Sequence, residues 1–350
     1  MDGRRYFEYI LAGNVKPEDL KYRSDLSDYY NFCKLSSRLN NKVKGLSRLR
    51  ESFTGSKQLV FTPVSRLAQN RAGIFKDTRE MQKYVKKLPP CSFVLTADIT
   101  LESPYFSQND EDFYLLDNNV LKEHVFKVPM ATGSSWKGAL AASAKKLVKE
   151  DLGRFPGFAR IWGTGSNEFR ELLEALKKNR KEDLTGAVIS YALFGLGLDL
   201  KKEDLTAIRK DPADYMRKLA ADANVFAQPH KGRAIFYSTF FNKLSFEVIN
   251  PHDRRRRAGA NPINYEVVPA GAIGKLQVVY IPYDAVLLDF DTLWKQAGED
   301  LGFLCEVIER TAKEGIGAKT KLGWGSFRLS EKKFCIAGGT IISVEGWDKC

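Results

Sequence analysis

Residues 128–147 read VPMATGSSWKGALAASAKKL, and they set the interpretation of the segments on either side. Two serines follow a glycine, which predicts a helix with Ser134 or Ser135 as its N-cap. Beyond them, apolar side chains return every three or four residues and share one helical face: Trp136, Leu140, Ala144 and Leu147. The stretch therefore predicts an amphipathic helix that packs against a core.

The start of this predicted helix has two interpretations. A helix N-terminus offers unpaired backbone N–H groups and partial positive charge, and here a glycine, two hydroxyls and Lys137 accompany it. Together these groups suit a phosphate. A capped helix with a surface lysine explains the same residues, and the stretch taken alone favours that simpler interpretation.

Strands are predicted on both sides of the helix. Residues 92–103 (SFVLTADITLES) alternate along the chain, which predicts a half-buried strand. Strand character returns in RAIFYSTFFNKLSFEVI, AIGKLQVVYIPYD and WGSFRLSEKKFCI. Residues 291–314 carry a second amphipathic helical pattern, which Gly315 ends.

The order of these elements is strand, helix, strand, strand, helix, strand. We predict an α+β fold with a ferredoxin-like, RRM-like βαββαβ core, an arrangement that in RRM proteins binds single-stranded RNA. Residues 1–90 form an N-terminal extension, residues 91–336 the core and residues 337–350 a tail. A helical insertion is expected at about residues 150–230.

Composition limits the class of protein. Of 350 residues, 43% are hydrophobic and 12% aromatic, which is typical of a globular chain rather than a disordered one. The sequence contains no apolar run long enough for a membrane span and no signal-peptide core, so we expect a cytoplasmic protein. The five cysteines are far apart and lack zinc-site spacing, which predicts five free thiols: Cys33, Cys91, Cys305, Cys335 and Cys350.

The positive charge is concentrated at the N-terminus. The net charge is +12, and residues 1–90 hold 19 lysines and arginines against 9 acidic residues. The other 260 residues are nearly balanced, with 36 against 34. This excess favours a polyanionic partner, above all a nucleic acid, although a solvated basic surface would have the same composition.

A glycine-rich segment, GIGAKTKLGWG, follows the second predicted helix. It does not have the spacing of a Walker loop or of a dinucleotide-binding loop. Glycines with lysines can still wrap a phosphate backbone, through Lys319, Thr320 and Lys321. A helix C-cap followed by a tight turn explains Gly315 but leaves the other three glycines unexplained.

Two further loops carry concentrated charge. In HDRRRRAGANPINYE, four consecutive arginines suit phosphate and base contacts, or form a solvated loop. NDEDFYLLDNN could bind Mg²⁺, although composition favours a simple acidic loop: Asp110, Glu111, Asp112 and Asp117. The three histidines are scattered and form no recognisable catalytic order: His124, His230 and His252.

In this order the motifs resemble the RAMP superfamily of CRISPR-associated proteins, over about residues 92–336. The resemblance rests on LLDNNVLKEHVFKVPMATGSSWKGAL, YALFGLG, RAIF, INPHDRRRRAGANPINYEVVPAG and GIGAKTKLGWG. Each motif alone is weak, and their order and placement make the match specific. More narrowly, the chain is similar to the backbone subunits of type III-like effector complexes.

The resemblance implies copies of the protein stacked along a guide RNA (crRNA), with target RNA and other effector subunits as partners. A separate nuclease could be among those subunits. The residues implied in guide contact are Ser134, Ser135, Lys137, Lys319, Thr320 and Lys321. A thumb hairpin at about residues 245–270 would push between bases through Asn250, Arg254, Arg255, Arg256, Arg257 and Asn261.

In cleaving members of the family, an aspartate at the position of Asp117 cuts target RNA with a divalent metal. The resemblance therefore leaves three functions open: a binding subunit, a subunit that is also a Mg²⁺-dependent endoribonuclease, and a stand-alone guide-processing nuclease. No tightly bound cofactor is expected. An RRM-like RNA binder outside the family is a further alternative, and it leaves the ordered glycine motifs unexplained.

The chain departs from the family pattern in three places. Family members usually begin close to the first strand, whereas this chain has about 90 residues before it. The segment ATGSSW replaces a proline–glycine lead-in, and NPINYE lacks the arginine usual after NP. We expect the extension to contact a neighbouring subunit, the guide or an accessory nuclease.

Overall fold

A computed structural model describes residues 58–109, 118–164, 171, 181–190, 192, 200–221, 231–249, 252–253, 258–259, 263–285, 288–338 and 342–350. Asp117 and the thumb candidates Asn250, Arg254, Arg255, Arg256, Arg257 and Asn261 lie outside these residues.

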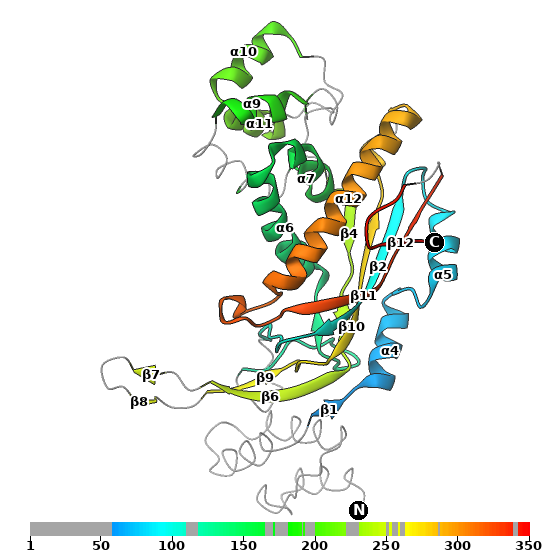
Figure 1. Cartoon of the computed structure of the whole chain (residues 1–350), viewed down its shortest axis with the longest axis vertical. Helices are drawn as coiled ribbons and strands as arrows, with labels where there is room; N and C mark the ends of the chain where they lie inside the picture. The colour runs from blue at the N-terminus through cyan, green and yellow to red at the C-terminus, as the bar shows by residue number, and fades with distance from the viewer. Residues whose placement is uncertain are drawn as a thin grey trace, which may run out of the picture.

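A five-stranded sheet forms the centre of the protein (Figure 1). Its strand order is β12-β11-β2-β10-β4, and every neighbouring pair is antiparallel except β11 and β12. The strands are β2 (Phe93–Leu101), β4 (Ala234–Phe236), β10 (Ile273–Tyr280), β11 (Phe327–Ile336) and β12 (Asp348–Lys349).

Two long helices cover one face of this sheet, α6 (Gly133–Glu150) and α12 (Phe290–Glu314) (Figure 1). Both predicted apolar faces are confirmed, because the following side chains are buried in one core: Trp136, Leu140, Ala144, Leu147, Leu293, Ala297, Leu301, Leu304 and Ile308. Gly315 ends α12, as predicted, with a φ of 86°.

The α+β class is confirmed. Along the chain the central elements follow one another as β2, α6, β4, β10, α12 and β11. This arrangement brings the ends of segments more than 200 residues apart in sequence onto adjacent strands, as where Phe327 of β11 lies opposite Leu101 of β2.

Two short helices, α4 (Thr62–Arg71) and α5 (Thr78–Val85), lie on the other face of the sheet (Figure 1). Met81 and Val85 of α5 pack on Val94 of β2, which is fully buried. The prediction that β2 is half-buried was therefore wrong over its first half, because α5 covers the face that the alternation had placed toward solvent.

The connection between α4 and α5 is fixed to the sheet by Gln277 of β10. The Oε1 atom of this side chain accepts a hydrogen bond from the Phe75 backbone N–H at 2.8 Å, and its Nε2 atom donates to the Gly73 carbonyl at 3.1 Å. The described end of the extension is thus part of the packed body.

A second sheet lies at one end of the central one, with strand order β1-β6-β9. Two further two-residue pairs, β3–β5 and β7–β8, are antiparallel, and β7–β8 lies beyond the free ends of β6 and β9 (Figure 1). The strands are β1 (Leu59–Val60), β3 (Met130–Ala131), β5 (Thr239–Phe240), β6 (Lys243–Ile249), β7 (His252–Asp253), β8 (Ala258–Gly259) and β9 (Ile263–Val267).

The segment expected to be a helical insertion is helical where it is described. Its helices are η2 (Leu152–Arg154), α7 (Phe155–Trp162), α9 (Lys181–Ser190), α10 (Lys202–Lys210) and α11 (Pro212–Ala221). Helix α7 packs against α6 and α12, whereas α9, α10 and α11 cluster away from the sheet (Figure 1). No helix in the described part of the chain has the length and apolarity needed to cross a membrane.

The prediction of five free thiols was wrong for two cysteines. Cys335 and Cys350 form a disulfide, with Cα atoms 5.2 Å apart. The cause is strand β12, which pairs in parallel with β11 and brings the last residue of the chain beside Cys335. Cys91 and Cys305 are free and buried, and Cys33 lies outside the described residues.

Candidate nucleic-acid interface

Helix α6 begins with Thr132 as its N-cap, so the prediction of Ser134 or Ser135 was wrong. The Thr132 side chain accepts a hydrogen bond from the Ser135 backbone N–H at 3.0 Å, and its backbone is extended. The Ser134 and Ser135 hydroxyl oxygens each lie 2.8 Å from the Thr132 hydroxyl oxygen. Three hydroxyl groups therefore gather at the N-terminus of a long helix.

The strands around α6 fix the position of its first turn. A Cβ atom on Gly133 would lie 2.2 Å from the Phe236 carbonyl oxygen, so only glycine fits this approach to β4. The Trp136 indole is buried and donates a hydrogen bond to the Thr239 hydroxyl at 2.9 Å. Ser134 stays exposed and Lys137 half-buried, next to this anchored backbone.

The glycine-rich segment connects α12 to β11 and contains one 3₁₀ turn, η5 (Thr320–Leu322). It packs tightly on the chain at residues 104–106, where Ala318 N–H donates to Phe106 O and Gly325 N–H to Pro104 O, each at 2.8 Å. A Cβ atom on Gly317 would lie 2.5 Å from the Phe106 carbonyl oxygen. Close packing thus explains glycines that a helix cap alone does not.

Two glycines of this loop provide a matched test. Gly323 and Gly325 have φ values of 81° and 80°, but a Cβ atom on Gly325 would lie 2.0 Å from the Ile316 carbonyl oxygen, whereas one on Gly323 would meet nothing within 4 Å. We expect Gly323→Ala to cost about 1–2 kcal/mol, because of its left-handed backbone alone. Gly325→Ala should cost about 1–3 kcal/mol more, from overpacking. Denaturant unfolding measures both, and equal losses would contradict the close approach.

The three predicted polar residues of the loop lie in different environments. Lys319 has a left-handed backbone, with φ of 66°, and its Nζ atom lies 4.6 Å from the centroid of the Tyr265 ring and 5.9 Å from that of Trp324. This geometry is a cation–π interaction. Thr320 is half-buried, and Lys321 is exposed with no ion pair to any described residue.

Tyr265 of β9 brings several sequence motifs together. It forms a parallel bridge with Asn118, the residue that follows Asp117, and the Glu266 N–H donates to the Asn118 carbonyl at 2.9 Å. Lys319 lies over the same tyrosine ring. Residue 118, the glycine-rich loop and the base of the β6–β9 hairpin therefore meet at one place.

Tyr105 connects this place to the start of α6. Its hydroxyl donates to the Met130 carbonyl at 3.4 Å, and a Cβ atom on Gly317 would lie 2.7 Å from its ring. Burial raises the pKa of Tyr105 far above that of a free tyrosine. We name the junction as Asn118, residues 132–137, Tyr265 and residues 315–325.

A buried ion pair holds the strand segment beside the junction. Lys122 and Glu266 are in direct contact and both side chains are fully inaccessible to solvent. Lys122 also donates to the Val120 carbonyl at 3.2 Å, and the Val120 N–H donates to Glu266 at 3.3 Å. Sequence analysis missed this pair, since an isolated lysine between exposed residues carries no signal of burial.

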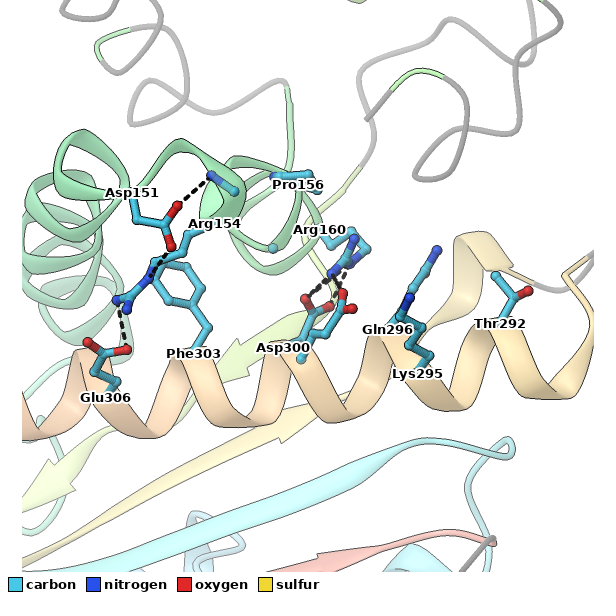
Figure 2. Close-up of a pocket in the computed structure, with 13 residues that line it drawn as sticks. Asp151, Arg154, Pro156, Arg160, Thr292, Lys295, Gln296, Asp300, Phe303 and Glu306 are labelled. Carbon is cyan, nitrogen blue, oxygen red and sulfur yellow. Dashed lines mark hydrogen bonds and ion pairs between the residues drawn. The ribbon is translucent and has the colours of Figure 1, made fainter. Parts of the chain in front are cut away.

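A groove of about 720 Å³ lies between η2, α7 and α12 (Figure 2). Its walls carry both signs of charge, and Arg154 binds Glu306 at 2.7 Å while Phe303 lines the floor. Arg160 and Asp300 also line it. Because its charges are paired across the groove, it offers no excess charge to a ligand.

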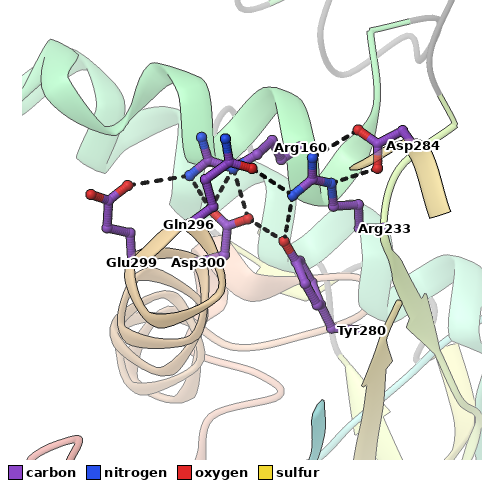
Figure 3. Close-up of polar contacts among 7 residues, drawn as sticks. All are labelled: Arg160, Arg233, Tyr280, Asp284, Gln296, Glu299 and Asp300. Atoms are coloured by element: carbon purple, nitrogen blue, oxygen red, sulfur yellow. Dashed lines mark hydrogen bonds and ion pairs between the residues drawn. The ribbon is translucent and has the colours of Figure 1, made fainter. Parts of the chain in front are cut away.

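Behind the groove lies a polar cluster that joins the insertion to the core (Figure 3). Arg160 of α7 donates from Nε to Asp300 of α12 at 2.9 Å, and the Tyr280 hydroxyl donates to the same carboxylate at 2.6 Å. Arg233 donates to the Tyr280 hydroxyl at 2.9 Å and pairs with Asp284 at 2.7 Å. Burial and then the Asp300 charge raise the pKa of Tyr280 far above its usual value.

The described part of the chain contains no group of three or more His, Cys, Asp or Glu side chains that could hold a metal ion. At the junction the acidic side chain nearest in sequence to β9, Glu266, is committed to Lys122.

A family model of the RAMP superfamily matches residues 98–328. The chain belongs to the RAMP superfamily. The matched region begins in β2 and ends in β11, so it contains every part of the junction, whereas α4 and α5 precede it.

Two solved structures are similar to this RAMP superfamily chain. One is a chain from the cryo-EM structure of the type III-B Cmr-beta bound to cognate target RNA, at 12% identity, with 96% of this chain and 88% of that one covered and a TM-score of 0.44. The other is the crystal structure of Cmr6 from Pyrococcus furiosus, at 14% identity, 68% and 99% coverage and a TM-score of 0.31. No curated protein matches the sequence.

Proposed function

We propose that this RAMP superfamily protein is a backbone subunit of an RNA-guided CRISPR effector complex. It binds the guide RNA, positions complementary target RNA and oligomerises along the guide, together with other effector subunits, in the cytoplasm. The observation that carries the proposal is the junction, where the α6 N-terminus, the glycine-rich loop and the base of the β6–β9 hairpin converge.

The junction has the chemistry of a phosphate-backbone contact. The first turn of α6 supplies backbone N–H groups and the helix dipole, and Ser134 is exposed beside them. Lys137 and Lys321 add full charges, and Lys319 is held over two aromatic rings. These groups read charge and shape, so sequence specificity is left to base pairing between guide and target.

The covered sheet favours this proposal over an RRM-like mode of binding. In RRM proteins bases stack on the open sheet face. Here α5 lies on that face and buries Val94 and Thr96 of β2, while Gln277 holds the α4–α5 connection across it. Bases therefore cannot stack on this half of the sheet.

We expect the double variant Lys137→Ala/Lys321→Ala to weaken guide RNA retention roughly tenfold for each lysine–phosphate hydrogen bond that it removes, since such a charge-assisted bond is worth about 1.5 kcal/mol. The chain is co-expressed with its effector subunits and a guide array, and bound RNA is extracted and quantified. Lys149→Ala is the matched control, because Lys149 is exposed at the opposite end of the same helix. A heterogeneous RNA smear that moderate salt removes equally from both variants would end the proposal.

A second candidate function is cleavage of target RNA through Asp117 with Mg²⁺. Asn118, the next residue, is fixed at the junction by Tyr265 and Glu266, which favours a defined position for its neighbour. Because Glu266 is committed to Lys122, a metal there would depend on Asp117 and the RNA. If the subunit cuts, Asp117→Ala abolishes cleavage by the assembled complex and leaves guide retention unchanged. A cut that survives EDTA and is lost in His124→Ala would instead indicate a stand-alone guide-processing nuclease.

A further inference from the structure

Helices α4 and α5 carry an unusual excess of unpaired positive charge. The described residues 58–90 contain seven exposed lysines and arginines against two acidic residues: Arg66, Arg71, Lys76, Arg79, Lys83, Lys86 and Lys87. Not one of these seven forms an ion pair with a described residue, whereas many cations elsewhere in the described chain do. We call this surface the α4–α5 face.

The two acidic residues of the face are used within the backbone. Asp77 is the N-cap of α5 and accepts a hydrogen bond from the Glu80 N–H at 2.9 Å. The Glu80 carboxylate in turn accepts from the Lys76 N–H at 2.9 Å. Both carboxylates therefore order the start of the helix and leave the neighbouring cations uncompensated.

The cations of α5 follow one stripe of the helix. Arg79, Lys83 and Lys87 are spaced four residues apart, on the side away from the buried Met81 and Val85. Like charges at this spacing cost the helix about 0.2–0.5 kcal/mol for each pair. A bound polyanion would relieve that repulsion.

The face is rigidly mounted and separate from the junction. Gln277 holds the α4–α5 connection to the sheet, and the Lys275 ammonium donates to the carbonyls of Phe75 and Lys76 at 3.4 Å. Helices α4 and α5 lie on the opposite side of the central sheet from α6 and α12 (Figure 1). On the same side, exposed Arg328 of β11 pairs in register with Thr100 of β2.

We propose that the α4–α5 face is a second RNA-binding surface that holds the phosphate backbone of single-stranded RNA without regard to sequence. The exposed side chains of α5 are polar or charged, with no exposed aromatic residue, whereas the centres of protein–protein interfaces are rich in aromatic residues and poor in lysine. Phosphates are the natural partner of such a surface. The choice of RNA over DNA rests on the proposed function, and the choice of a phosphate backbone does not.

The test compares two triple variants of the full-length chain. Arg79→Gln/Lys83→Gln/Lys87→Gln removes three charges from the α4–α5 face, and Lys202→Gln/Arg209→Gln/Lys210→Gln removes three exposed charges from α10. Binding of fluorescein-labelled single-stranded RNA of scrambled sequence is measured by anisotropy over a range of KCl concentrations. The slope of log K against log [KCl] should fall by about 2 in the α4–α5 variant, at roughly 0.7 for each phosphate contact. It should stay unchanged in the α10 variant.

An equal change in both variants, or none in the α4–α5 variant, would overturn the proposal. A salt slope that is unchanged while the α4–α5 variant loses affinity for another effector subunit would also overturn it and assign the face to a protein partner. Guide retention by Lys137→Ala/Lys321→Ala is measured in parallel. Normal retention there, with a reduced slope in the α4–α5 variant, would reject the junction and keep this face.

Discussion

Replacing Asp300 with asparagine is expected to lower the free energy of unfolding by about 3–5 kcal/mol, because it leaves Arg160 buried without its counter-charge. Asp300 is completely buried and receives hydrogen bonds from both Arg160 and Tyr280. The loss should be greatest at the joint between α7 and α12, so amide hydrogen exchange in α7 should rise more than in β2.

The neighbouring Glu299 provides the control for this variant. Its carboxylate lies 3.5 Å from the same Arg160 guanidinium, but its side chain is 55% exposed. Exposed ion pairs are worth about 0–1 kcal/mol, so Glu299→Gln should change stability by less than 1 kcal/mol. Chemical denaturation followed by tryptophan fluorescence measures both variants. Similar losses in the two would show that burial of the Arg160–Asp300 pair is not what stabilises the joint.

Replacing Glu266 with glutamine is expected to have a similar effect, about 3–5 kcal/mol, because Lys122 would remain buried and charged. This variant also tests the junction. Glu266 anchors the segment that carries Asn118, so its loss should weaken guide or target RNA binding as well as stability. Stability is followed by denaturant unfolding, and RNA binding is measured below the unfolding transition.

The double variant Lys122→Met/Glu266→Leu separates the charge from the packing. Apolar residues of similar size often replace a buried ion pair without loss of stability. The double variant should therefore recover most of the stability that Glu266→Gln loses. If it remains as unstable as the single variant, the pair contributes through its backbone hydrogen bonds to Val120 rather than through charge compensation.

The regular elements could be predicted from sequence because their signals are local. Trp136, Leu140 and Ala144 repeat at helical spacing, and the strand at residues 93–101 alternates, so α6 and β2 were found in place. Family membership followed from short motifs in a fixed order, and the family match confirms it. The convergence of those motifs around Tyr265 is a property of the folded chain alone.

Features that depend on distant parts of the chain were missed or wrong. Arg160 and Asp300 are 140 residues apart in sequence, so no window of sequence connects them. Cys350 reaches Cys335 only because β12 adds to the sheet. At the start of α6, Thr132, Ser134 and Ser135 all have hydroxyls suited to a cap, and only the extended backbone of Thr132 decides among them.

The layer formed by α4 and α5 also governs how the protein can be shortened. Val94, Val279 and Cys335 lie under α5 and are at most 3% exposed. Trimming the chain to the region shared with its family would leave these side chains as a bare apolar strip across three neighbouring strands. Such a strip invites self-association, so solubility as well as RNA binding ties these N-terminal helices to the rest of the molecule.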